Sequence, residues 1–189
     1  MGIRLILAAV TLGCFAAGAT PAAAQQTTVT YHLFHFEGGS WVEYYPGNSF
    51  PAGGDQPGTN LWRYRYEMCN YSFSSGIREL NVFFNSDNVL CAGFDSAAQP
   101  ADWTTTPVGP FAPDNNWRAR FRTLVTAARV AQGTCNDEFL VEFTWTCATL
   151  PGSQNFDAIS TSGSDAGTTA PAVPVAIEAS TWGRLKLIR

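Results

Sequence analysis

Charged side chains are scarce in this sequence. They make up 14% of its 189 residues, whereas about a quarter is usual in a globular protein. Lysine occurs once, at Lys186, and the other basic residues are arginines. The formal net charge is −4, and a chain with this balance is a poor partner for a nucleic acid, because phosphate backbones bind cationic surfaces.

Several patterns that carry catalysis or metal binding are also missing. No two cysteines have the C-x-x-C spacing of a zinc site, no serine lies in a G-x-S-x-G elbow, and no EF-hand spacing surrounds the oxygen-rich stretches "DNN" and "CNDE". The acidic residues Asp137, Glu138 and Glu142 lie along one predicted strand, where solvation explains them. We therefore predict no metal, no cofactor and no enzyme activity.

The two histidines, His32 and His35, lie in "TTVTYHLFHFE", a stretch rich in β-branched and aromatic residues. A strand places residues three apart on opposite faces, so these two side chains are poorly placed to bind the same metal ion.

Long hydrophobic runs are absent after the N-terminus, which excludes a membrane-spanning helix there. Residues 1–24 combine one charge (Arg4), a short apolar run and small residues at Ala22 and Ala24. This order is typical of a secretory signal peptide, so we predict cleavage after Ala24 and a secreted or cell-surface protein. Lipoprotein processing at Cys14 is the alternative. Cleavage after Ala24 changes the formal net charge from −4 to −5.

Four cysteines then remain, and an even number in an exported chain indicates two disulfides. Cys135 and Cys147 flank an extended segment whose length of about 3.3 Å per residue keeps them too far apart for a bridge. We therefore expect Cys69 and Cys91 each to pair with one of Cys135 and Cys147. The spacing leaves open which one pairs with Cys69.

Alternating patterns predict an all-β fold. "LWRYRYEMC" and "EFLVEFTWTC" each place apolar residues on one face of a strand and mostly polar residues on the other. Further strands are expected in 27–37 and 41–45 as a hairpin, in "IRELNVFFN" pairing back on the strand before it, in "NVLCAGFD", and in "NFDAIS" as the last strand. The sequence has many short strands and no regular alternation of strands with helices. It therefore predicts an antiparallel two-sheet β-sandwich of the immunoglobulin-like kind over residues 25–160.

Two segments are harder to interpret. Residues 117–132 fit either a helix or a strand, and the alternation from Trp117 to Thr123 favours a strand. Residues 96–116 contain four prolines and are expected to form a long irregular connection.

The tryptophans divide into two groups. Trp62, Trp117 and Trp145 lie on the apolar faces of their strands and are expected in the core. Trp41 and Trp103 are the better candidates for exposure, where they could stack on sugar rings.

The C-terminus consists of two segments. Residues 161–180 are rich in Ala, Pro, Ser, Thr and Gly and are expected to form a flexible linker. Residues 181–189, "TWGRLKLIR", regain apolar and basic side chains and are expected to be a tail that binds a protein or an envelope surface. Its predicted contacts are Trp182, Gly183, Lys186 and Arg189. The alternative is that the tail docks as a final strand on its own domain.

The stretches "LWRYRYEMCNYSFSSGIRELNVFF", "RVAQGTCNDEFLVEFTW" and "LPGSQNF" resemble small bacterial secreted β-sandwich proteins of uncharacterised function. The ending "STWGRLKLIR" is similar to Trp-Gly-x-x-Lys tails on exported proteins of uncultivated bacterial lineages. The resemblance implies export and surface presentation, and it implies no activity.

Two functional hypotheses follow. The first is a non-enzymatic extracellular or cell-surface β-sandwich, structural or adhesive, whose tail serves in sorting, anchoring or assembly. The second is a polysaccharide-binding module that uses Trp41 and Trp103.

Overall fold

The computed structural model describes residues 26–45, 61–84, 91–111, 116–147 and 150–172. Eleven strands and one short 3-10 helix, η1 (Thr126–Ala128), make up its regular structure. The strands are β1 (Thr28–Glu37), β2 (Ser40–Tyr44), β3 (Leu61–Asn70), β4 (Ile77–Phe84), β5 (Ala92–Ala98), β6 (Thr104–Phe111), β7 (Asn116–Arg122), β8 (Thr134–Trp145), β9 (Asn155–Ser160), β10 (Ser164–Thr168) and β11 (Ala170–Pro171).

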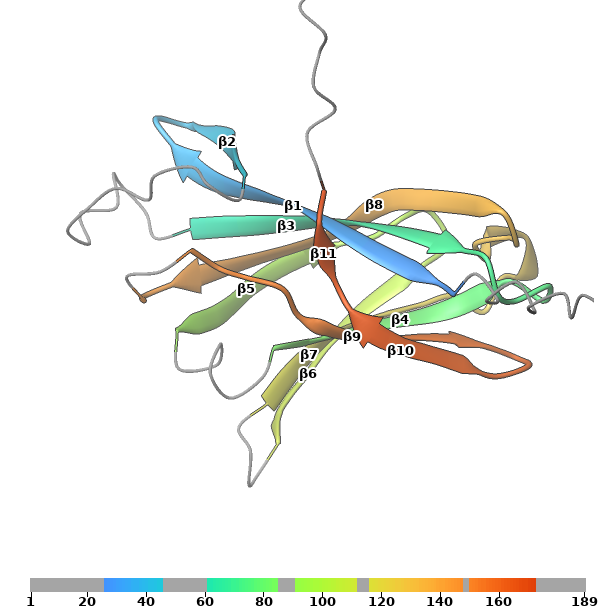
Figure 1. Cartoon of the computed structure of the whole chain (residues 1–189). Coiled ribbons are helices and arrows are strands. Elements are labelled where there is room, and N and C mark those ends of the chain that lie inside the picture. Colours follow the sequence, from blue (N-terminus) through green and yellow to red (C-terminus); the bar gives the residue numbers. More distant parts are fainter. Residues whose placement is uncertain (1–25, 46–60, 85–90, 112–115, 148–149, 173–189) are drawn as a thin grey trace, which may run out of the picture.

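The strands form two stacked sheets, and the predicted β-sandwich is confirmed (Figure 1). Sheet A has the order β11-β1-β3-β8-β5, and β2 pairs with part of β1. Sheet B has the order β10-β9-β4-β7-β6. All pairs are antiparallel except the short β1–β11 pair, which is parallel.

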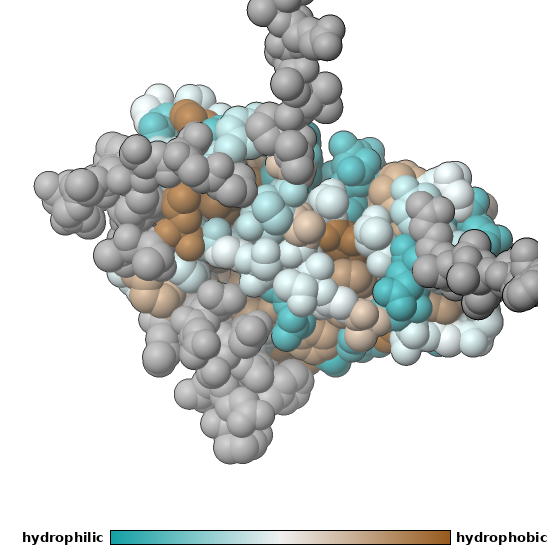
Figure 2. All heavy atoms as spheres, in the orientation of Figure 1, coloured by the Kyte–Doolittle hydropathy of each residue, from teal (hydrophilic) through white to brown (hydrophobic). Residues whose placement is uncertain are grey.

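Aromatic side chains fill the space between the sheets. Tyr64 lies at the centre, fully buried, with its ring stacked on Phe143 at 5.0 Å and on Tyr66 at 5.4 Å. Trp62, Trp117 and Trp145 are all buried, as their strand faces predict. Buried tyrosine hydroxyls need hydrogen-bond partners, and the hydroxyl of Tyr64 donates to the carbonyl of Gly152 at 2.7 Å. Seen in the orientation of Figure 1, the outer surface of the molecule mixes polar residues with small hydrophobic areas (Figure 2).

Both disulfides join a cysteine from the middle of the chain to one of the last two, as the length of the strand between Cys135 and Cys147 predicts. Cys69 on β3 bonds to Cys135 on β8, and Cys91 bonds to Cys147. Residues 69 and 135 are also direct cross-strand neighbours in the β3–β8 ladder.

The hairpin of β1 and β2 is confirmed and turns at two glycines. Gly38 and Gly39 have φ of 56° and 87°, the left-handed values that a two-residue hairpin turn requires and that glycine adopts without strain. The strand predicted from Trp117 is confirmed as β7.

The predicted pairing of "IRELNVFFN" with the strand before it is wrong. This segment is β4, which lies in sheet B between β9 and β7, whereas β3 lies in sheet A. The chain crosses between sheets at a corner held by Asn70, whose side-chain amide donates to the carbonyls of Phe73 and Val130. Gly76 completes the corner at φ +75°, and a Cβ there would lie 2.9 Å from the Cβ of Arg129.

Two segments expected to be irregular form strands. Residues 104–111 are β6, and Pro107 is tolerated because β6 is the outermost strand of sheet B, so no second neighbour needs a backbone N–H from it. Residues 164–171 are β10 and β11, so the folded domain extends past the predicted boundary at Ser160. Asp165 helps to hold this end, because its carboxylate accepts the backbone N–H of Thr27 at 3.1 Å.

Candidate functional site

The two tryptophans predicted to contact glycans lie in different environments. Trp103 is 4% exposed, and its indole Nε1 donates to the carbonyl of Ala128 at 2.8 Å. The prediction of exposure is therefore wrong for Trp103: η1 and the residues after it cover the ring, which packs edge-to-face on Phe139 at 5.0 Å. Trp41 is half-buried on β2 and stays a candidate contact residue.

The predicted tail contacts Trp182, Gly183, Lys186 and Arg189 lie outside the described residues, as do the predicted signal peptide, Cys14 and residues 173–180 of the predicted linker. Their roles stay predictions.

The outer surface of sheet A brings aromatic and basic side chains together from three strands. The ladder places Phe34 of β1 opposite Arg63 of β3, and Phe36 of β1 opposite Trp41 of β2. Arg65 follows on β3 with the same orientation as Arg63. We call these five half-buried residues (Phe34, Phe36, Trp41, Arg63 and Arg65) the aromatic–arginine face.

The side chains of this face hold one another in place. The guanidinium of Arg63 lies 3.9 Å from the ring centroid of Trp41, and its Nε donates to Glu142 Oε1 on β8 at 2.9 Å. The other carboxylate oxygen of Glu142 accepts the hydroxyl of Ser96 at 2.6 Å. Arg65 lies over Phe34 at 5.6 Å. Cation–π contacts of this kind contribute about 0.5–1 kcal/mol each at exposed sites.

The sequence did not predict this face. Along β3 the pleat does separate the inward aromatics from the outward arginines, as expected. The aromatic partners of Arg63 and Arg65 come from β1 and β2, whose register relative to β3 cannot be read from one strand's pattern.

On the inner side of the hairpin, a histidine, a glutamate and a tyrosine form a connected group. His35 is 1% exposed, and its Nδ1 lies 2.8 Å from Glu37 Oε1. The same oxygen accepts the hydroxyl of Tyr44 at 2.6 Å. This bond raises the pKa of Tyr44 to about 12, and the bonds from Tyr44 and His35 lower the pKa of Glu37.

On the outer side of the hairpin, a second group repeats this chemistry. His32 Nδ1 lies 2.5 Å from Glu43 Oε1, and Glu43 Oε2 accepts the hydroxyl of Tyr45 at 2.8 Å. Partial burial raises the pKa of Glu43, but the bonds from His32 and Tyr45 and the charge of Arg65 outweigh it, so the pKa is lowered. His32 and His35 therefore lie on opposite faces, as predicted, and each is bonded to a different glutamate.

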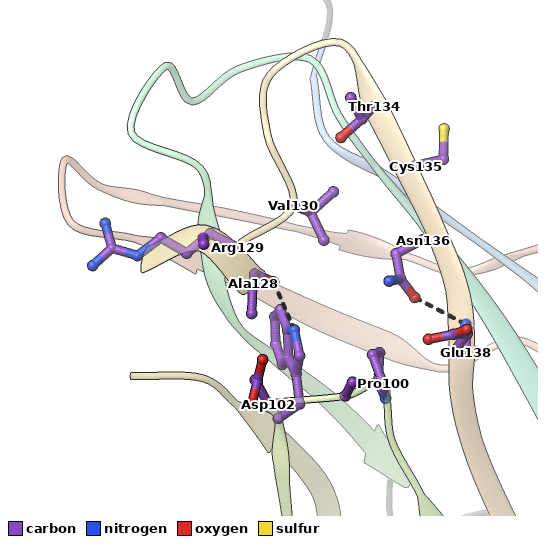
Figure 3. Close-up of a pocket in the computed structure, with 12 residues that line it drawn as sticks. Pro100, Asp102, Ala128, Arg129, Val130, Thr134, Cys135, Asn136 and Glu138 are labelled. Atoms are coloured by element: carbon purple, nitrogen blue, oxygen red, sulfur yellow. Dashed lines mark hydrogen bonds between the residues drawn. The ribbon is translucent and has the colours of Figure 1, made fainter. Parts of the chain in front are cut away.

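A polar cavity of about 380 Å³ lies next to Trp103, between η1, the start of β8 and the turn before β6 (Figure 3). Asn136 uses its side-chain oxygen to accept the backbone N–H of Glu138 at 3.0 Å. Arg129 points away from the cavity in Figure 3 and donates to the carbonyl of Ser75. Asn136 and Arg129 are therefore engaged in holding the loops together.

Among the residues that the structure describes, one cluster has metal-binding residue types. Glu67, Cys69 and Cys135 have ligand atoms within 4.8 Å of one another, but both sulfurs belong to a disulfide and are not the thiolates that bind metals. Within the described ranges, no helix has the length and apolar character to cross a membrane.

Comparison with known proteins gives no family. No protein-family model matches the chain, and no curated protein matches it.

Solved structures of cohesin modules are similar in fold at a low level. The cohesin of a Coh-OlpA-Doc918 complex from Clostridium thermocellum has 9% identity and a TM-score of 0.40, and the match covers 78% of this chain and 100% of that one. The sixth cohesin from scaffoldin B of Acetivibrio cellulolyticus gives the same values. The seventh ScaB type I cohesin from Pseudobacteroides cellulosolvens has 9% identity and a TM-score of 0.36, covering 62% of this chain and 86% of that one. Similarity at this level carries no inference about function.

Proposed function

We propose that this chain is a non-enzymatic extracellular or cell-surface β-sandwich, structural or adhesive, that binds a protein partner through the aromatic–arginine face. We further propose that its C-terminal tail (residues 181–189) serves in sorting, anchoring or assembly. The observation that carries the first proposal is the ordered contact of Trp41 with Arg63 on the outside of sheet A.

Tryptophan and arginine are the residue types most enriched at the energetic centres of protein interfaces. A side chain that is already fixed loses less entropy on binding. Arg63 is fixed on two sides, by the ring of Trp41 and by the carboxylate of Glu142. The face therefore combines suitable residue types with a low cost of ordering.

The charges on this surface favour a protein over a polyanion. The two arginines alternate with Glu43 and Glu142, so the surface has no excess of positive charge. Alternating signs allow a partner with complementary charges to bind in one register, whereas a polyanionic chain would be repelled by the glutamates.

A non-catalytic role is supported by the state of four carboxylates on the described strands. Glu79, Glu142, Glu37 and Glu43 each accept a hydrogen bond from a neighbouring basic or histidine side chain, and the pKa of each is lowered. A general acid at neutral pH needs a raised pKa instead. A broad hydrolase screen that detected turnover would contradict this part of the proposal.

Sheet B provides a matched control for the binding test. Arg118 lies over Phe83 at 5.9 Å on the outer surface of sheet B, so both sheets carry an exterior arginine–aromatic pair. The test compares the double variant Trp41→Ala/Arg63→Ala with Phe83→Ala/Arg118→Ala, and measures retention of the full-length protein on the envelope of the cells that secrete it. We expect retention to fall at least about tenfold for the sheet A variant only, as for the loss of interface hot spots. An equal loss of retention for both variants, or no loss for either, would contradict binding through the aromatic–arginine face.

A polysaccharide-binding function is the second candidate. It is favoured by the partial exposure of Trp41 and by the edge contact of its ring with Phe36 at 5.2 Å, which holds the indole in place as a stacking surface. Co-sedimentation with a panel of insoluble glycans, abolished by Trp41→Ala, would support this function over a protein partner.

A further inference from the structure

A small pocket lined by three tyrosines lies at the edge of the sandwich, where the β1–β2 hairpin meets the segment that leads into β9. Its volume is about 220 Å³, and its lining consists of Tyr31, Leu33, Tyr44, Tyr45, Leu150, Pro151 and Gly152. Figure 2 shows hydrophobic atoms at the surface just below the hairpin, beside this segment. Pockets for drug-sized ligands usually measure about 300–1,000 Å³, so this one suits a group of a few heavy atoms.

Two of the three tyrosine hydroxyls donate hydrogen bonds to glutamates. Tyr44 donates to Glu37 at 2.6 Å, and Tyr45 donates to Glu43 at 2.8 Å. Tyr31 is 7% exposed, and this burial raises the pKa of its hydroxyl. The rings are therefore held in fixed positions, and what they offer to a ligand is mainly their aromatic surface.

The electrostatics of the pocket favour a cation. Aromatic faces carry partial negative charge and attract ammonium groups. Two carboxylates, Glu37 and Glu43, accept the hydroxyls of two of these tyrosines, and their pKa values are lowered. Among the described residues, the lining includes no basic side chain. Arg65 and His32 lie next to Glu43 on its outer side and offset part of its charge.

From this combination we infer that the tyrosine pocket binds a small organic cation of the quaternary ammonium class, of about the size of choline. The ligand is a free small molecule. The aromatic rings contact the methyl groups of the cation, and the carboxylates bonded to the tyrosine hydroxyls stabilise its charge at a distance without a direct salt bridge.

The decisive experiment compares choline with 3,3-dimethylbutan-1-ol, a neutral molecule of the same shape. Each is titrated into the full-length protein while the tyrosine ring signals are followed by NMR. A cation–π contribution predicts that choline binds at least about tenfold more tightly than the alcohol. Equal affinities would overturn the inference in favour of a simple apolar pocket, and so would the absence of binding for both. Binding to phosphatidylcholine vesicles without binding to choline would overturn the free-molecule assignment.

Variants then test the site itself. Tyr45→Ala removes a half-buried ring from the wall and is expected to weaken choline binding about tenfold or more, while Tyr45→Phe keeps the ring and most of the affinity. Tyr71→Ala is the matched control, because Tyr71 follows the far end of β3 and is not part of the lining. Thermal melting of each variant checks that it folds. An equal loss for Tyr71→Ala and Tyr45→Ala would contradict the assignment.

Discussion

Sheet A is cross-linked by disulfides, and sheet B is not. Cys69–Cys135 joins β3 to β8, and Cys91–Cys147 joins the residue before β5 to the segment after β8. None of the five strands of sheet B contains a cysteine. Sheet B instead has a polar group on its central strand: Glu79 of β4, 7% exposed, accepts a hydrogen bond from Arg120 at 2.8 Å.

The edge strand β5 of sheet A and the central strand β4 of sheet B also differ in how much of each is buried. In the edge strand β5 only Ala92 is buried, so burial alone holds β5 weakly, and the bridge next to it restricts its freedom. In sheet B, β4 is buried at six of its eight positions, and Glu79 is among them. A covalent link stabilises mainly by restricting the unfolded chain, whereas the Glu79 group stabilises the native state directly.

The largest expected effect on stability comes from removing a disulfide of sheet A. The double variant Cys69→Ala/Cys135→Ala should lower the free energy of unfolding by about 2–5 kcal/mol, as the loss of a native disulfide does. Urea denaturation under oxidising conditions measures it. The Cys91–Cys147 bridge closes a loop of similar length, 56 against 66 residues. Its removal in Cys91→Ala/Cys147→Ala should therefore lower the free energy of unfolding by a similar amount. A loss below about 1 kcal/mol in both would mean that sheet A does not depend on its bridges.

A smaller effect is expected from the polar group of sheet B. Glu79 Oε2 lies 2.8 Å from Nη2 of Arg120 and 3.7 Å from Nε of Arg122. Glu79→Gln removes the negative charge that these two arginines face, and it should lower the free energy of unfolding by about 1–3 kcal/mol. Glu142→Gln is the control on sheet A, where the carboxylate paired with Arg63 is more exposed (21% against 10% for Glu79) and the pair should contribute at most about 1 kcal/mol. Equal effects would mean that burial of Glu79 is unimportant.

The pH dependence of the same variant gives an independent measurement. Burial raises the pKa of Glu79, but hydrogen bonds from Arg120 and Asn81 and the charges of both arginines outweigh it, so the pKa lies below its ordinary value of 4.5. A lowered pKa means that the stabilisation is complete above about 4.5 and is lost as the pH falls further. Wild-type stability should therefore fall more steeply below pH 4.5 than that of Glu79→Gln. Parallel curves would contradict this.

The sequence predicts best where one strand's own pattern decides the structure. The strict alternation of β3 and β8 predicted that Trp62 and Trp145 are buried, and the length of β8 excluded a Cys135–Cys147 bridge. The hairpin followed from two adjacent glycines between strand-forming residues. In each of these cases the controlling contacts are local, or they follow from strand geometry alone.

Prediction fails where a distant partner decides. Trp103 is buried because the carbonyl of Ala128, which η1 positions, accepts its indole N–H. Residues 164–168 lack large apolar side chains, yet they form β10 by pairing with β9. The aromatic–arginine face depends on the register between three strands. Composition and period contain none of this information.

The smallest effect on stability is expected from removing the tail. The described fold ends with β11, which pairs with β1 at Thr30 and Tyr31, and the backbone N–H of Ala172 donates to the carbonyl of Tyr31 at 2.8 Å. Truncation after Ser180 leaves all of these contacts intact, so we expect the free energy of unfolding to change by less than about 0.5 kcal/mol. Localisation or assembly should change instead, because residues 181–189 are proposed to bind a partner.

A second truncation makes this result specific. Ending the chain after Ser160, the domain boundary that the sequence predicted, removes β10 and β11 and with them the bond from Thr27 to Asp165. It should destabilise the fold strongly in thermal melting, while truncation after Ser180 should not. If truncation after Ser180 also lowered the melting temperature and left localisation normal, the tail would be a docked part of the sandwich. Its apolar and basic residues would then serve stability, because a segment that binds its own domain is not available to a partner.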